Sequence, residues 1–182
     1  MADLVGFAGS LRAGSYNRAL LAAAVDAMPA GSSLDALPID DVPLYNADVE
    51  TGEGIPASVR LIKDRIAAAD GLVIATPEYN GGVPGVAKNV IDWISRPSDD
   101  MKRVTYGKPV ALIGATPGGL GTALSQAAWQ QVLRSLRMQV FTLGGPFYVS
   151  SAAKSFDDEG RLSDELAERI AAYMAAFVAS LR

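Results

Sequence analysis

Short apolar runs alternate with amphipathic stretches along the whole of this 182-residue chain. The apolar runs predict buried strands at 4–8, 34–39, 72–75, 109–113 and 138–141. The spacing of apolar side chains predicts helices at 20–28, 59–69, 86–94, 124–136 and 166–181. Pro56 is well placed at the start of the second helix, after an expected loop over 40–55. Strand–helix repetition of this kind predicts an α/β fold, an open five-stranded parallel sheet with helices on both faces.

Nothing in the sequence divides the chain into parts. It has no internal repeat, no low-complexity linker and no block of like charges. At roughly 150 residues per domain, 182 residues predict one domain over 1–182.

Composition excludes several kinds of chemistry. The chain has no cysteine and no histidine, which removes thiolate catalysis, iron–sulfur clusters, a Ser-His-Asp triad and the usual transition-metal ligand sets. We therefore expect no metal site, and any redox chemistry must use a bound cofactor.

Charge and hydropathy exclude two classes of partner. A net charge of −4 argues against nucleic acid and anionic membranes. The N-terminal apolar run 4–8 is too short for a signal peptide, and the uncharged stretch 170–181 is shorter than the ~18 residues of a membrane span. We expect a cytoplasmic location.

The loops after the first, third and fourth expected strands are rich in glycine. In an open parallel sheet, ligands bind beyond the carboxyl ends of the strands, so these loops are the candidate site. The first is Gly9-Ser10-Leu11-Arg12-Ala13-Gly14-Ser15-Tyr16-Asn17-Arg18. Backbone N–H groups at a helix start, hydroxyl and amide donors and an arginine fork together favour a phosphate.

This first loop matches neither of the common nucleotide motifs. Ser15 stands where a Walker A motif needs lysine, and Gly6-x-x-Gly9 lacks the spacing of the dinucleotide fingerprint. The alternative interpretation is structural: Ser15 and Asn17 are good helix caps, and Arg12 is solvated.

The second and third loops suit the approach of a flat ring. Thr76-Pro77-Glu78-Tyr79-Asn80-Gly81-Gly82-Val83-Pro84-Gly85 is a shaped loop whose backbone amides favour a heterocycle such as a flavin. By itself it also fits a tight connection with Glu78 as a turn residue. The third loop, Thr116-Pro117-Gly118-Gly119-Leu120-Gly121, is a weaker signal of the same kind. Lys88 and Asp92 indicate a solvated helix face with an i,i+4 pair, and Trp129 and Leu133 indicate core or subunit contact.

The first two loops resemble the signatures of the NADPH-dependent FMN reductase family. Lys88-Asn89 and Ile91-Asp92-Trp93, after the second loop, resemble it too, whereas Gly82 stands where many members have serine. The resemblance implies a flavodoxin-like fold with sheet order 2-1-3-4-5. It also implies that the FMN phosphate is held by Ser10, Arg12, Ser15 and Asn17, with Tyr16 alongside. Pro77, Glu78, Tyr79, Asn80 and Gly81 would line the isoalloxazine edge, and Thr116 would lie near the ring or ribityl chain.

The function that the resemblance implies is an FMN-dependent NAD(P)H oxidoreductase. It would pass hydride from NAD(P)H to bound FMN and then to a flavin, quinone, azo compound or metal oxyanion. FMN would do the chemistry, so no catalytic side chain is expected. Its partners would be NAD(P)H, a small electron acceptor and further copies of the chain in a homodimer or homotetramer. The alternatives are a flavodoxin-like one-electron carrier without NAD(P)H oxidation, and a non-redox phosphate-binding protein that uses the first loop alone.

Overall fold

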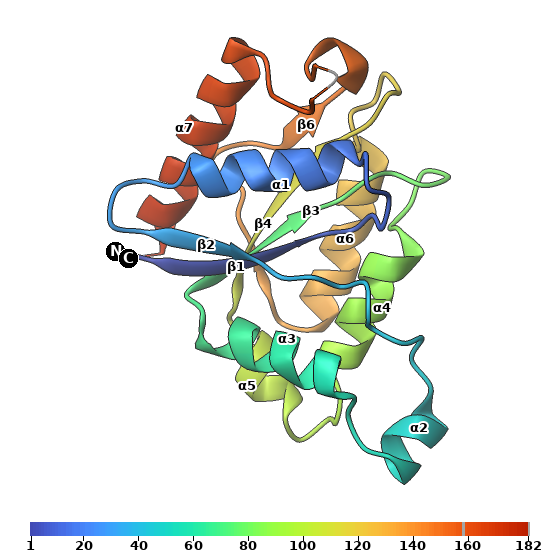
Figure 1. The fold of residues 1–182 in the computed structure, drawn as a ribbon. Coiled ribbons are helices and arrows are strands. Elements are labelled where there is room, and N and C mark those ends of the chain that lie inside the picture. The colour runs from blue at the N-terminus through green and yellow to red at the C-terminus, as the bar shows by residue number, and fades with distance from the viewer. Residues whose placement is uncertain (158, 182) are drawn as a thin grey trace.

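A parallel sheet lies at the centre of the computed structural model, which describes residues 1–157 and 159–181 (Figure 1). The strands run in the order β2-β1-β3-β4-β5, and β6 also pairs with β4. This order is that of flavodoxin-like folds, and it confirms the sheet expected from the sequence. The strands are β1 (Asp3–Ala8), β2 (Ser33–Ala36), β3 (Gly71–Ala75), β4 (Pro109–Ala115), β5 (Gln139–Val140) and β6 (Phe147–Val149).

The fifth position of the sheet is shared by two short strands. β5 pairs with Pro109 and Val110 at the start of β4, and β6 pairs with its last residues, Ile113–Ala115. The N–H of Phe141 still donates to the Val110 carbonyl at 2.8 Å, and residues 142–146, which include Gly144-Gly145-Pro146, then leave the ladder. The expected strand at 138–141 is therefore present but shorter, and its position continues in a segment that the sequence pattern did not indicate.

Helices cover both faces of the sheet. They are α1 (Tyr16–Asp26), α2 (Ala47–Gly52), α3 (Ala57–Ala68), α4 (Gly85–Ile94), α5 (Met101–Thr105), α6 (Ala123–Ser135) and α7 (Asp164–Ser180), with a 3₁₀ turn at Ala152–Lys154. Side chains alternate along the strands: Leu4 and Ala8 face the core beneath α1 and α7, whereas Val5 and Phe7 face the core beneath α3–α6. No helix of the described residues is long and apolar enough to cross a membrane.

Helix α6 differs from the expectation in the face that it buries. Trp129 and Leu133 lie in the core, as predicted, but Leu124, which begins the expected apolar spacing 124–136, is 48% exposed. In its place Ser125 and Gln126 are buried in the first turn, because both have polar partners there.

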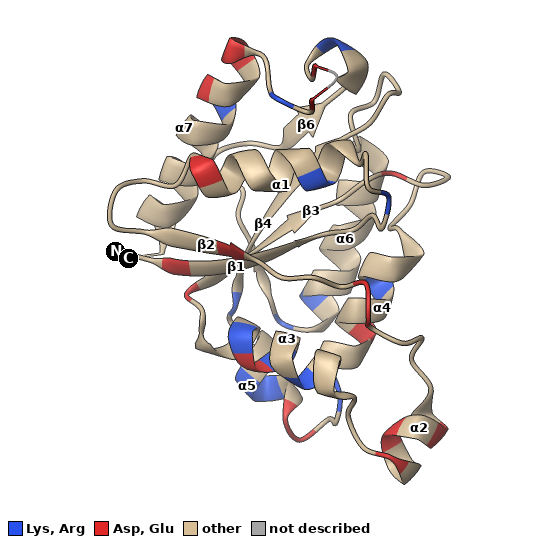
Figure 2. Ribbon diagram, viewed as in Figure 1, with Lys and Arg blue, Asp and Glu red and all other residues tan. Residues whose placement is uncertain are grey.

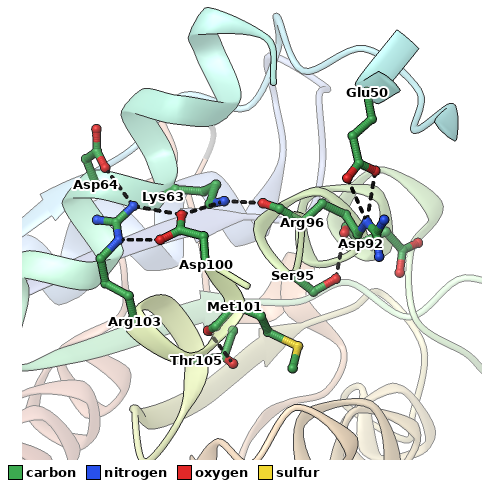
Figure 3. Close-up of polar contacts among 10 residues, drawn as sticks. All are labelled: Glu50, Lys63, Asp64, Asp92, Ser95, Arg96, Asp100, Met101, Arg103 and Thr105. Carbon is green, nitrogen blue, oxygen red and sulfur yellow. Dashed lines mark hydrogen bonds and ion pairs between the residues drawn. The ribbon is translucent and has the colours of Figure 1, made fainter. Parts of the chain in front are cut away.

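Two short helices, α2 and α5, were not expected, and ion pairs hold them in place (Figure 3). Buried Lys63 of α3 pairs with Asp100 at 2.8 Å and donates to the carbonyl oxygen of Arg96. Arg103 of α5 pairs with the same Asp100 at 2.7 Å. Hydrogen bonds from Arg103 and Lys63 hold the pKa of the Asp100 carboxyl far below its ordinary value. Glu50 of α2 accepts two hydrogen bonds from the Arg96 Nε.

The segment before α2 is tied to α4 by two residues of the second signature. Asn89 accepts from the backbone N–H of Tyr45 and donates to the carbonyl of Pro43, each at 2.8 Å. The indole N–H of Trp93 donates to the same carbonyl at 2.7 Å. The predicted i,i+4 pair on the exposed face of this helix is confirmed, with Lys88 Nζ 2.6 Å from Asp92 Oδ1.

Candidate functional site

Three glycine-rich loops meet at the carboxyl ends of β1, β3 and β4. They enclose a pocket of about 120 Å³. Gly9 is fixed against the end of β3 by its N–H, which donates to the Ala75 carbonyl at 2.8 Å. The pocket is lined by Ser10, Arg12, Ser15, Tyr16, Asn17, Pro77, Glu78, Tyr79, Ala115, Thr116 and Pro117. Of the residues predicted for the site, only Asn80 and Gly81 are outside this lining, at the tip of the second loop.

The first loop leaves a row of backbone donors open. Ser15 is the N-cap of α1, and its Oγ accepts from the N–H groups of Asn17 and Arg18 at 3.2 and 3.4 Å. Within residues 1–157 and 159–181, no acceptor meets the N–H groups of Ser10, Leu11, Ala13, Gly14, Ser15 and Tyr16. Unpaired donors at the positive end of a helix attract an anion.

The polar side chains of the first loop lie at the same place. Arg12 is exposed, and its Nη2 donates to the Gly14 carbonyl at 2.8 Å, which leaves other guanidinium donors unpaired. Ser10 is buried, and its Oγ accepts from the hydroxyl of Tyr79 at 3.3 Å. The first and second loops are therefore joined across the pocket.

The second loop is a two-residue hairpin. Tyr79 and Gly82 exchange backbone hydrogen bonds of 3.3 and 3.0 Å, and Asn80 and Gly81 between them have positive φ angles of 52° and 70°. An Asn-Gly pair is preferred in such a turn, since both positions need the left-handed conformation. The hairpin holds Tyr79 outward, so that 47% of it is exposed.

Glu78 reaches from this loop to the start of another helix. Its Oε2 accepts from the backbone N–H groups of Leu124 and Ser125 at 2.8 and 3.1 Å. Thr122, the N-cap of α6, has φ of 75° and provides no side-chain cap. The carboxylate of Glu78 therefore serves as the cap, a role that neither sequence interpretation anticipated.

The side-chain amide of Asn17 is hydrogen-bonded to the backbone of β4. Its Nδ2 donates to the Ala115 carbonyl at 2.8 Å, and its Oδ1 accepts from the Ala115 N–H at 2.9 Å. This pair of bonds fixes the first turn of α1 to the end of the neighbouring strand. A direct bond from Asn17 to a phosphate stays a prediction, and its amide already has this structural role.

Tyr16 and Thr116 complete the wall of the pocket. The ring of Tyr16 packs against Phe156, with centroids 5.1 Å apart. The N–H of Thr116 donates to the Val149 carbonyl, and its carbonyl accepts from Ala152, both at 3.0 Å. These contacts fix the third loop to β6 and the turn after it.

A buried polar cluster supports the second loop from behind. The hydroxyl of Thr76 accepts from the indole N–H of Trp129 at 2.9 Å and lies 3.0 Å from the Ser125 Oγ. The sequence pattern placed Trp129 in the core or a subunit contact and did not indicate these partners. The available signal was the indole itself, because a buried Trp N–H needs an acceptor.

Close packing at the end of β4 leaves no space for a side chain at Gly114. A Cβ added there would lie 2.1 Å from the Thr122 Oγ1 and 2.6 Å from the Thr76 carbonyl oxygen. The second and third loops can approach each other this closely only because Gly114 is glycine.

Fold and site together define a flavodoxin-like protein with open backbone donors on the strand-to-helix loop after β1. The family model for NADPH-dependent FMN reductases matches residues 2–154, and the chain belongs to this family. It is 43% identical over 168 residues to the NAD(P)H-dependent FMN reductase of Pseudomonas aeruginosa, covering 92% of this chain and 88% of that one. It is 44% identical over 132 residues to a quinone reductase of Escherichia coli, covering 72% and 69%.

A solved structure agrees with these relatives. The flavoenzyme NAD(P)H:(acceptor) oxidoreductase FerB of Paracoccus denitrificans superposes with a TM-score of 0.87 at 32% identity. The match covers 100% of this chain and 97% of FerB. The family implied by the loop motifs is thereby confirmed.

Proposed function

We propose that this protein is an FMN-dependent NAD(P)H oxidoreductase that reduces a flavin, quinone, azo compound or metal oxyanion. The observation that carries the proposal is the open row of N–H donors at the start of α1, in a pocket that the second loop also lines. Family membership and relatives named FMN reductase and quinone reductase support the same activity.

The described residues offer donors suited to both the phosphate and the ring edge of FMN. The first loop offers its open N–H groups, the Arg12 guanidinium and the Ser10 hydroxyl to the phosphate. The exposed N–H groups of Asn80 and Gly81, which meet no acceptor among the described residues, suit the acceptor atoms at the edge of the ring. Pro77, Tyr79 and Thr116 supply surface beside them.

FMN supplies the redox chemistry when it is bound, because it can take up a hydride equivalent and release it to an acceptor. This chain's part is to bind and orient. The first loop holds the phosphate, and the rigid hairpin with its support from Thr76 and Trp129 fixes the edge of the site. No described side chain is assigned as an acid or a base.

An anaerobic absorbance titration tests the proposed function. Purified protein loaded with FMN should lose the ~450 nm flavin band within seconds of adding one equivalent of NADPH or NADH. Bound FMN that neither nucleotide bleaches would favour a one-electron carrier. Protein that takes up no FMN would refute the proposal.

We also propose that the protein is a homodimer or homotetramer in the cytoplasm, where NAD(P)H is available. Residues 109–133 carry no charge, and α6 has a single charged residue, Arg134 (Figure 2). Within this stretch Leu120 is 60% and Leu124 48% exposed, and Leu143, in a second uncharged stretch at 138–153, is 85% exposed. Copies that each carry −4 repel one another, so an uncharged apolar surface favours their contact. Light scattering should give two or four times the 19.0 kDa chain mass, and a monomer would refute this.

A further inference from the structure

The start of α6 depends on a side chain from a different loop. A helix begins with N–H groups that have no partner within it. In α6 the N–H of Ala123 donates to the Leu120 carbonyl at 3.1 Å. Those of Leu124 and Ser125 donate to the Glu78 carboxylate. The bonds to Glu78 span 46 and 47 residues, so they join the second loop to the third loop and its helix.

This helix start lies against the candidate site. Glu78 itself lines the pocket formed with the first loop. Leu124, in the first turn of α6, is so close to the hairpin that a Cβ added to Gly81 would lie 3.4 Å from its Cδ1. An electric field that arises at the N-terminus of α6 therefore acts on a ring held by the second loop.

The Glu78 carboxylate meets backbone N–H groups at the start of the helix. No Lys or Arg within the described parts of the chain forms an ion pair with its carboxylate. The N-terminus of a helix carries a partial positive charge, and an acidic side chain there offsets it. Reduction of a flavin adds negative charge, which a bare helix N-terminus would stabilise and a carboxylate opposes.

We propose that Glu78 is a positioning residue that seals the N-terminus of α6 and thereby keeps the reduction potential of bound FMN low. The inference rests on the proposed function and adds to it the control of the cofactor's potential. A low potential favours passing electrons on to an acceptor over retaining them. The same hydrogen bonds hold the second loop in a fixed position relative to the third loop and its helix.

Glu78→Gln separates charge from geometry, since the amide oxygen can still accept from Leu124 and Ser125. We expect this variant to bind FMN and to have a higher two-electron midpoint potential than wild type. The expected shift is about threefold to tenfold in the affinity ratio of reduced to oxidised FMN, or roughly 15 to 30 mV for a two-electron couple. Glu78→Ala should also raise the potential. It should further lower the melting temperature of the apoprotein by about 2–4 °C, because α6 loses its cap.

The matched control is Glu165→Gln, an acid in the first turn of α7 that does not line the pocket. The midpoint potential of FMN bound to the Glu165→Gln variant should equal that of FMN bound to the wild-type protein. A wild-type potential in Glu78→Gln would overturn the inference, and so would an equal shift in Glu165→Gln. Wild-type protein that binds no FMN would instead refute the proposed function, and the inference with it.

Discussion

Replacing Asn17 by alanine tests whether this residue holds the fold or the ligand. Asn17 is 3% exposed, and its side chain makes both of its hydrogen bonds to Ala115, which is also buried. We therefore expect Asn17→Ala to destabilise the protein even when no FMN is present. A residue that served only as a phosphate ligand would change FMN affinity and leave the stability of the apoprotein unaltered.

The magnitude follows from the two groups that lose their partner. Truncation leaves the N–H and the carbonyl of Ala115 buried and unpaired, at about 1–3 kcal/mol for each group. Water that enters the vacated space relieves part of this cost. We expect a loss of about 2–4 kcal/mol, which is a large share of a typical stability of roughly 5–15 kcal/mol.

Urea unfolding of the apoprotein, followed by circular dichroism, is the appropriate assay. With a slope of about 2 kcal/mol/M, the midpoint should fall by roughly 1–2 M. Asn17→Asp is the matched variant, because it keeps the acceptor for the Ala115 N–H and loses the donor. It should be destabilised as well, since its carboxylate faces the Ala115 carbonyl. An unchanged midpoint in Asn17→Ala, together with weaker FMN binding, would show that our structural assignment is wrong.

Two further predictions concern charged residues. Arg12→Ala should weaken FMN binding about tenfold or more and leave the melting temperature unchanged, because the side chain is exposed and its hydrogen bond to Gly14 is local. Arg134→Ala on α6 is the control variant. Unchanged FMN affinity in Arg12→Ala would contradict the phosphate assignment. Asp100 has a folded-state pKa below the unfolded value of roughly 4, because Arg103 and Lys63 hold it ionised. Its pairing therefore stabilises the fold above that pH and is lost as the pH falls through the lower folded-state pKa. Urea titrations should show a larger difference between wild type and Asp100→Asn at pH 7 than at pH 3, and a constant difference would refute the argument.

The central part of the fold could be predicted because buried strands consist of continuous runs of apolar residues. Every residue of β3 is buried, so that strand is a continuous apolar run. The sites of the three loops followed from a general property of parallel sheets, whose strands all end at one edge. The donors of the first loop favoured a phosphate, and the family motif then implied which residues hold it, which stays a prediction for the individual residues.

The remaining features depend on partners far away in the chain. Glu50 meets Arg96 across 46 residues, which fixes α2 in a segment that has no apolar period of its own. Asn17 and Ala115 are 98 residues apart, so no local pattern distinguishes this asparagine from an ordinary helix cap. The predicted buried face of α6 was wrong at its first turn. Gln126 is buried there and donates a hydrogen bond to the Phe147 carbonyl, and hydropathy cannot indicate such a bond.

The divided fifth position of the sheet also bears on how this chain avoids aggregation. An exposed edge strand is a template on which another chain can add a strand. Here β2 has four residues, and β5 and β6 have two and three, with Pro146 just before β6. Both edges are thus too short to support a long intermolecular ladder, and proline cannot donate to one. A protein built on a wholly parallel sheet, which is slow to form, is thereby protected against cross-β assembly.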